Sequence, residues 1–154
     1  LLFGMVSKEI IEVLPATGNR QGEEMFKVIF ADGVEKVFHS WDYTSIYSHP
    51  DLYERLYCDM LDFSAYKSIG KLLIEYAGEE HNNLRVLDVA CGSGLMGKFL
   101  VKESPLKIDF ILGVDILPEA IQALHRDCAD VYKEAMTVEE FQRRSDMNEV
   151  NLTA

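Results

Sequence analysis

One segment constrains the fold of this chain more than any other: a short apolar strand that contains an acidic residue and runs into a turn of small residues. The segment is Val86-Leu-Asp-Val-Ala-Cys-Gly-Ser-Gly94, and apolar residues recur at helical spacing directly after it. A strand, a glycine-containing turn and a helix in this order are typical of α/β proteins with a parallel sheet. In such sheets ligands bind at the carboxyl ends of the strands, where small residues let the backbone approach them closely. The segment therefore predicts a ligand site as well as a fold class.

Two acidic residues indicate what kind of ligand this is. Asp88 lies inside the strand, and a carboxylate in a strand buried on both faces costs several kcal/mol unless a polar or cationic group meets it. A cationic group of a bound ligand would be such a partner. Asp115 ends the next apolar strand, 21 residues after Gly94. This is close to the roughly 20-residue spacing at which a carboxylate binds ribose hydroxyls in nucleotide-binding sheets. Together, the two carboxylates indicate an adenosine-containing cofactor.

Periodicity and composition divide the chain into three parts, namely 1–40, 41–80 and 81–154. The first part is β-rich, because two aromatic and β-branched runs, 25–30 and 34–38, flank an Asp-Gly turn that is typical of a hairpin. The second part is helical. Apolar residues recur at helical spacing over about 50–62, where Ser48 supplies a capping hydroxyl and Pro50 a first-turn proline, and again from Ser64 to a stop at Gly78.

The third part alternates strands with helices. Strands are predicted at 84–89 and 109–114, with a short third strand at 129–133. Helices are predicted after Gly94, from about Pro118, and over 138–144, where Thr137 and Glu140 have the spacing of a capping box. Strands separated by helices imply βαβ units, so we expect a parallel sheet flanked by helices.

The same residues resemble a known family. Asp88-Val-Ala-Cys-Gly-Ser-Gly94 resembles the first motif of the class I S-adenosylmethionine-dependent methyltransferases, and Gly113-Val-Asp115-Ile resembles the acidic end of their second strand. The resemblance covers 84–135, and 41–77 more loosely. It implies a Rossmann-like α/β fold, S-adenosyl-L-methionine as the cofactor, and transfer of its methyl group to an oxygen, nitrogen or carbon atom of a small-molecule acceptor that the sequence does not identify.

The resemblance also implies roles for individual residues. Asp88 would hold the amino end of the cofactor's methionine part, Asp115 would bind the ribose hydroxyls, and Ile116 would pack near the adenine. The small-residue turn would lie against the methionine part, and a tyrosine of the aromatic stretch 41–47 would close over the cofactor. The predicted cofactor-binding residues are Tyr47, Asp88, Ala90, Cys91, Gly92, Gly94, Asp115 and Ile116. No catalytic residue is assigned, because the sulfonium already activates the methyl group and positioning supplies much of the catalysis.

The length of the predicted sheet sets a further expectation. A complete domain of this family has seven strands, whereas this sequence ends after its third predicted strand. We therefore hypothesise a truncated gene product, an incomplete gene model or a domain completed by a partner, and we expect weak cofactor binding and little turnover from the chain alone. The family's strand order leaves one edge of strand 84–89 unpaired, and an exposed apolar edge predicts aggregation or a homodimer.

Two other classes of protein fit parts of the pattern. Gly92-Ser-Gly-Leu-Met-Gly97 matches the dinucleotide-binding fingerprint, and with Asp115 downstream it would suit an NAD(P)- or FAD-binding oxidoreductase. Asp88 argues against this class, since such strands rarely carry an acid in the middle. The third possibility is a non-catalytic interaction module that keeps the same scaffold.

Charge and composition exclude several partners. The 154 residues include 15 basic and 26 acidic side chains, a formal net charge of −11 that would repel the phosphate backbone of a nucleic acid. No apolar run approaches the roughly 20 residues that span a bilayer, and no secretory signal is evident. The three cysteines and four histidines lack the spacing of a metal site. We therefore expect a cytoplasmic protein without a nucleic-acid, membrane or metal partner.

Overall fold

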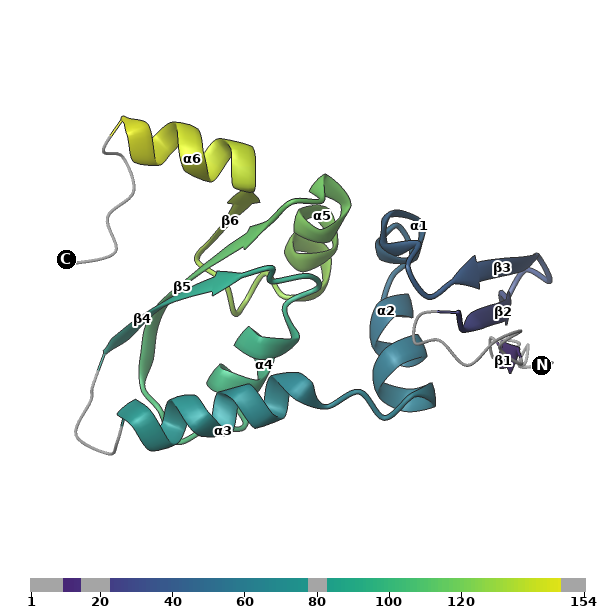
Figure 1. Ribbon diagram of the computed structural model, residues 1–154, viewed down its shortest axis with the longest axis horizontal. Coiled ribbons are helices and arrows are strands. Elements are labelled where there is room, and N and C mark those ends of the chain that lie inside the picture. Colours follow the sequence, from purple (N-terminus) through teal and green to yellow (C-terminus); the bar gives the residue numbers. More distant parts are fainter. Residues whose placement is uncertain (1–9, 15–22, 78–82, 148–154) are drawn as a thin grey trace, which may run out of the picture.

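The computed structural model describes residues 10–14, 23–77 and 83–147, which form two small sheets joined by helices (Figure 1). One sheet is antiparallel, with the order β1 (Ile10–Leu14), β2 (Met25–Ile29) and β3 (Glu35–His39). The other is parallel, with the order β4 (Leu84–Val89), β5 (Ile108–Asp115) and β6 (Glu134–Thr137). The predicted α/β class, the amino-terminal hairpin and the parallel sheet with flanking helices are confirmed.

The predicted hairpin joins β2 to β3 through the Asp-Gly turn. Gly33 adopts a φ of 85°, and its N–H donates to the carbonyl of Phe30 at 2.8 Å. The Asp32 side chain accepts a hydrogen bond from the Val34 N–H at 3.0 Å, which closes the turn locally. Strand β1, which the sequence analysis did not resolve within its β-rich part, pairs with the other side of β2.

The helical part contains α1 (Tyr43–Tyr47), α2 (Leu52–Glu54), the π-helical segment η1 (Arg55–Met60) and α3 (Ala65–Ala77). The predicted helix over 50–62 is present as α2 and η1, but its predicted cap is wrong. The Ser48 hydroxyl donates to the carbonyl of Ser45 and so closes α1, while Asp51 precedes α2 in a left-handed conformation. The predicted helix stop at Gly78 lies outside the described residues.

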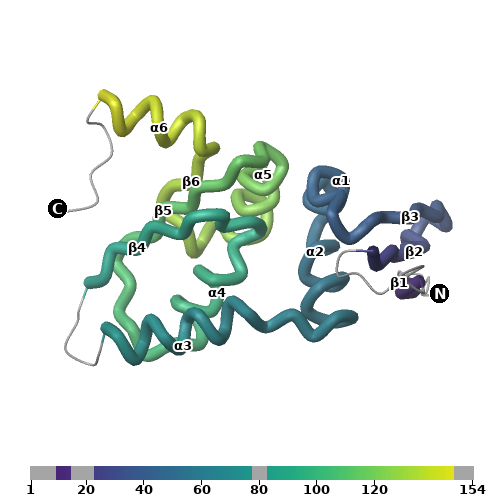
Figure 2. The backbone as a smooth tube through the Cα atoms, viewed as in Figure 1, coloured from purple at the N-terminus to yellow at the C-terminus, as the bar shows by residue number. Residues whose placement is uncertain are grey.

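The helices of the parallel part lie on both faces of its sheet (Figure 2). They are α4 (Leu95–Lys102), α5 (Pro118–Asp127) and α6 (Val138–Asp146). Side chains alternate along β5, so that Ile111 packs with Leu124 of α5 while Leu112 and its neighbours pack near Phe141 of α6. The capping box of α6 is present in part, because the Glu140 N–H donates to the Thr137 hydroxyl at 3.3 Å.

The predicted strand at 129–133 is wrong. These residues form a turn in which the N–H groups of Val131 and Tyr132 both donate to the carbonyl of Cys128, and β6 begins only at Glu134. Val131 and Tyr132 are nevertheless buried. They are apolar because they pack beneath the sheet against α5, and a run of that composition looks like a strand in the sequence.

Strand β4 is an edge strand within the described part of the chain, where it pairs with β5 alone, as the sequence analysis expected. The expectation that it is buried on both faces is wrong. Leu87 and Val89 remain 36% and 67% exposed because α6 covers β5 and β6 but has no comparable contact with β4. Asp88 projects from the opposite face, as alternation requires.

The amino-terminal part packs on the parallel part through α1, which has two apolar faces. Ile46 lies in the core of the antiparallel sheet with Phe26 and Phe38, whereas Tyr47 packs against Ala120 and Ala123 of α5.

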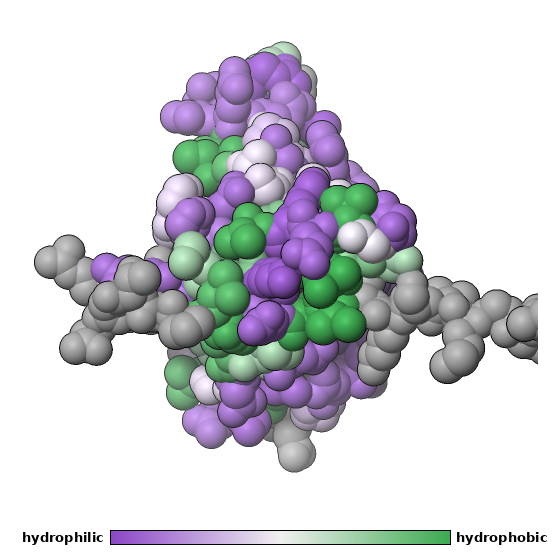
Figure 3. Space-filling view, turned by 90° about the vertical axis from the view of Figure 1, so that its right-hand side faces the viewer, coloured by the Kyte–Doolittle hydropathy of each residue, from purple (hydrophilic) through white to green (hydrophobic). Residues whose placement is uncertain are grey.

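Figure 3 views the end of the molecule formed by the amino-terminal part, where apolar side chains are exposed beside hydrophilic ones. No helix in the described ranges has the length and apolar character needed to cross a bilayer.

Candidate functional site

The turn after β4 has an unusual backbone. Ala90, Gly92 and Gly94 all adopt positive φ angles, of 59°, 53° and 91°. Glycine takes this conformation freely, whereas alanine pays about 1–2 kcal/mol for it. The turn is held by hydrogen bonds from the Cys91 N–H to the carbonyl of Val114 at 3.2 Å and from the Gly94 N–H to the carbonyl of Cys91 at 2.9 Å. The small residues thus allow the backbone conformation of this turn.

Asp115 connects this turn to the end of β5. One carboxylate oxygen accepts from the Gly92 N–H at 2.9 Å, and the other accepts from the Leu117 N–H at 3.0 Å. The side chain is buried. The structure therefore brings together the turn and the second acidic residue, as predicted, and shows that Asp115 also fixes the backbone. Its neighbour Ile116 is 77% exposed and touches no cavity described below.

Tyr47 of α1 covers the turn from above. Its hydroxyl lies so close to Gly92 that a Cβ atom there would be 2.7 Å from it. Burial raises the pKa of the Tyr47 phenol, and the nearby Tyr53 and Asp115 raise it further, so the phenol stays neutral. The helical part of the chain therefore contributes a neutral aromatic cover to the glycine-containing turn.

A cavity of about 280 Å³ lies between the turn and the helices α2 and α3. This is close to the lower limit of roughly 300 Å³ for small-molecule pockets. It is lined by Tyr47, Tyr53, Phe63, Ala65, Tyr66, Ile69, Asp88, Val89, Ala90, Cys91, Gly92, Ser93, Leu95 and Met96. Five of the predicted cofactor-binding residues are in this lining, and Gly94, Asp115 and Ile116 are not.

Asp88 has a partner that the sequence analysis missed. The hydroxyl of Tyr132 donates a 2.5 Å hydrogen bond to its carboxylate. Burial raises the pKa of Asp88, the bond from Tyr132 opposes this shift, and the charge of Asp115 adds to it. The net effect is a carboxyl group with a raised pKa at the edge of the cavity, and its negative charge would be stabilised by a cationic ligand.

The ring of Tyr132 explains three of the glycines. A Cβ atom at Gly94, Gly97 or Gly113 would lie 2.9, 2.5 or 3.0 Å from this ring. The Tyr132 hydroxyl also accepts from the Gly97 N–H at 3.1 Å. Gly97, which completes the dinucleotide-binding pattern in the sequence, therefore makes room for a side chain of the protein. The sequence signal for the position of the Tyr132 ring is Gly97, a third glycine that the turn itself does not need.

Ser93 is a second residue that the sequence analysis missed. Its hydroxyl oxygen is buried and has no hydrogen-bond partner within the described residues, although the residue lines the cavity. A buried polar atom of this kind costs free energy unless a ligand or water meets it. Ser93 precedes α4, whose amino terminus favours negative charge. An anionic ligand group beside Ser93 would accept a hydrogen bond from its hydroxyl and would be stabilised by the amino terminus of α4.

The buried thiols near the turn are not activated. Burial raises the pKa of Cys91 to about 12 and that of Cys128 to about 11, so both remain protonated at neutral pH. The Cys128 thiol donates to the carbonyl of Ser93 at 3.1 Å. A thiolate nucleophile is therefore not available here, which agrees with a space-filling role for Cys91.

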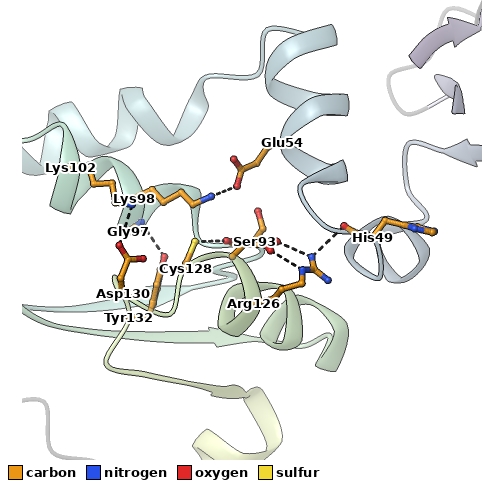
Figure 4. A network of polar contacts seen from close by, with 11 residues as sticks. His49, Glu54, Ser93, Gly97, Lys98, Lys102, Arg126, Cys128, Asp130 and Tyr132 are labelled. Atoms are coloured by element: carbon orange, nitrogen blue, oxygen red, sulfur yellow. Dashed lines mark hydrogen bonds and ion pairs between the residues drawn. The ribbon is translucent and has the colours of Figure 1, made fainter. Parts of the chain in front are cut away.

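Polar contacts hold the helical part on the parallel part, as Figure 4 shows. Lys98 of α4 forms a 2.5 Å ion pair with Glu54 of α2. Arg126 of α5 donates at 3.3 Å to the carbonyls of Tyr47 and His49. The bonds from Arg126 hold the backbone at Tyr47, whose hydroxyl lies against Gly92.

No protein-family model matches this chain, and no curated protein sequence matches it at a significant level. The fold and the site define an α/β protein with a small ligand cavity at the carboxyl end of a parallel strand.

Proposed function

We propose that this chain binds S-adenosyl-L-methionine in the cavity above the turn and belongs to a Rossmann-like methyltransferase that methylates a small molecule. The observation that carries the proposal is the charge of the cavity. Asp88 is the single acidic residue among the described residues that line it, and none of them is Lys, Arg or His. A cationic sulfonium and ammonium fit such a site, whereas the pyrophosphate of a dinucleotide would be repelled.

The pairing of Asp88 with Ser93 supports an amino-acid end on the ligand. Asp88 would accept from the ligand's ammonium group. The Ser93 hydroxyl before α4, which has no partner in the described part of the chain, would donate to the ligand's carboxylate. A methionine part carries both groups. The rings of Tyr47, Tyr53 and Tyr66 in the lining suit a neighbouring cation, since aromatic faces attract positive charge.

The remaining residues would position the cofactor and exclude water. Asp115 lies against Gly92 and would reach the ribose hydroxyls at the end of β5. When bound, the cofactor supplies a methyl group that the sulfonium has already activated. The protein's contribution is therefore orientation of the acceptor along the axis of displacement and exclusion of water by the aromatic cover.

The location and assembly follow from the same proposal. The three cysteines are free, with two of them buried, which fits a reducing compartment such as the cytoplasm. The uncovered edge of β4 fits pairing with a second copy of the chain.

Calorimetric titration with S-adenosylhomocysteine, and with NAD in parallel, tests the proposal. S-adenosylhomocysteine shares the adenosine and amino-acid ends of the cofactor, so its binding without NAD binding is the expected result. Binding of NAD alone would place the protein with the oxidoreductases. A folded sample that binds neither would support a non-catalytic interaction module instead.

A further inference from the structure

A second, larger cavity adjoins the first. It has a volume of about 650 Å³ and is bounded by the end of β3, α1, η1 and the segment before α3. Tyr53 and Phe63 line both cavities, so a ligand in one would lie next to a ligand in the other. The lining residues are Glu24, Ser40, Trp41, Tyr43, Tyr53, Tyr57, Leu61, Asp62, Phe63 and Ser64.

Stacked tyrosines connect the two cavities. Tyr47, which covers Gly92, stacks on Tyr53 with ring centroids 5.0 Å apart, and Tyr53 stacks on Tyr57 at 4.5 Å. Tyr57 in turn stacks on Tyr43 at 6.1 Å, and its hydroxyl donates to the carbonyl of Ser40. Burial raises the pKa of Tyr53 to about 12, so its ring stays neutral at physiological pH. The second cavity is thus walled by a continuous stack of tyrosine rings.

The charged groups of this cavity are acidic. Glu24 and Asp62 are carboxylates, and no Lys, Arg or His is among the described residues that line it. Glu24 is half-buried, with the Ser40 hydroxyl 3.5 Å from its carboxylate, and Asp62 lies where the chain turns from η1 towards α3. Aromatic faces with carboxylates at the margin attract an organic cation, each such contact contributing about 0.5–2 kcal/mol.

We infer that the aromatic cavity binds a hydrophobic organic amine and that this amine is the methyl acceptor. The apolar part of the amine would lie against Trp41, Tyr43 and Tyr57, and its nitrogen would be held by Glu24 and Asp62 until it turns towards Tyr53 and the first cavity. The acceptor role rests on the proposed function, whereas the binding of the amine does not.

The transfer step balances with an amine as the acceptor. The protonated amine first loses one proton to solvent, which leaves a nitrogen lone pair. That nitrogen forms a bond to the methyl carbon as the carbon–sulfur bond breaks, and the bonding pair stays on sulfur. The sulfonium becomes a neutral thioether, and the product leaves as an N-methylated ammonium ion.

Trp41 provides a direct probe, because it is the only tryptophan in the chain and lies in this cavity. We would titrate the protein with phenethylamine, and with the neutral 2-phenylethanol and the anionic 3-phenylpropionate at constant ionic strength, while following tryptophan fluorescence. The expected result is a saturable change with phenethylamine and at least tenfold weaker responses to the other two ligands. Equal responses to all three would overturn the inference.

Two variants test the carboxylates. Asp62→Asn keeps a side chain that tolerates the left-handed backbone at this position, where φ is 52°. Together with Glu24→Gln it should weaken phenethylamine binding about fivefold per carboxylate and leave 2-phenylethanol unchanged. Glu35→Gln, on β3 and outside the lining, is the matched control. Unchanged amine binding in the folded double variant would overturn the inference.

The outcome is separable from that of the proposed function. If S-adenosylhomocysteine binds and phenethylamine does not, the proposed function stands and this inference fails. If phenethylamine binds and S-adenosylhomocysteine does not, the amine site stands, while its role as an acceptor site and the proposed function both fail.

Discussion

The hydroxyl of Tyr132 donates a 2.5 Å hydrogen bond to the carboxylate of Asp88, across 44 residues of sequence. This contact connects the turn before β6 to Asp88, the acidic residue within β4 from which the sequence predicts a ligand site. The hydrogen bond from Tyr132 offsets part of the cost of burying the Asp88 carboxylate, while burial still raises the pKa of this group. A cationic ligand group would add to that compensation.

Replacement of Asp88 by asparagine should change the pH dependence of stability. Burial raises the pKa of Asp88 in the folded protein, so the folded state holds a proton that the unfolded chain has already released. The free energy of unfolding therefore falls as the pH rises from the usual aspartate range through the raised pKa. Asp88→Asn removes that fall and keeps an oxygen that accepts from Tyr132. Its melting temperature should match the parent's below this window and exceed it above.

The same variant should bind S-adenosylhomocysteine about ten- to a hundredfold more weakly, since a charged hydrogen bond to the ligand's ammonium group is lost.

Tyr132→Phe is the companion variant. It leaves the Gly97 N–H and Asp88 without their phenol partner, so it should lose about 1–3 kcal/mol of stability. Asp88→Asn less stable than the parent at every pH would contradict the assignment of a raised pKa.

Ala90→Gly should stabilise the protein. Ala90 has a φ of 59°, which costs about 1–2 kcal/mol, and glycine would relieve this while losing about 0.5–1 kcal/mol of backbone entropy. We expect a net gain of about 0.5–1 kcal/mol in denaturant unfolding. Ala123→Gly in α5, where the backbone is helical and the methyl group is buried against Tyr47, is the control and should lose about 1 kcal/mol or more. A loss of stability in both variants would argue against the left-handed turn.

The site could be predicted from the sequence only where the chemistry is local. Gly92 and Asp115 were identified because a turn and a strand end each follow from a few adjacent residues, and their hydrogen bond confirms their proximity. Tyr132 and Ser93 were missed. The contact of Tyr132 with Asp88 depends on how a distant turn packs. The buried Ser93 hydroxyl has no partner among the residues that the structure describes, and only a three-dimensional arrangement reveals this.

The fold shows the same limit. The hairpin and β4 were found because alternation and turn residues encode them locally. The run 129–133 has the composition of a strand, but two N–H groups converge on the Cys128 carbonyl and form a turn instead. The predicted burial of β4 was wrong for a comparable reason: coverage of Leu87 and Val89 depends on where α6 packs, which no feature of the strand specifies.

Asp115→Asn should weaken S-adenosylhomocysteine binding about tenfold, because one carboxylate acceptor for the ribose hydroxyls is lost. Asp115→Asn also leaves one of the N–H groups of Gly92 and Leu117 facing an amide NH2, and Asp115→Ala leaves both without acceptors, so each variant destabilises the turn and alanine does so more. Calorimetry with a parallel melting curve separates the two effects. Asp109→Asn, an exposed position on the same strand, is the control. If Asp115→Asn bound S-adenosylhomocysteine as tightly as Asp109→Asn does, a ribose contact at Asp115 would be refuted.

Leu87→Lys should reduce self-association through the edge of β4. Within the described residues, β4 pairs with β5 alone, so its other edge is open. Leu87 is 36% exposed on the face that α6 does not cover. A lysine on an edge strand disfavours pairing with a second chain because the charge would be desolvated. Light scattering over a range of concentrations should therefore show more monomer than for the parent. Leu72→Lys, on helix α3 and 63% exposed, adds the same charge away from a sheet edge and should leave the parent's association unchanged. An equal shift with both variants would mean that net charge, and not the β4 edge, controls the assembly.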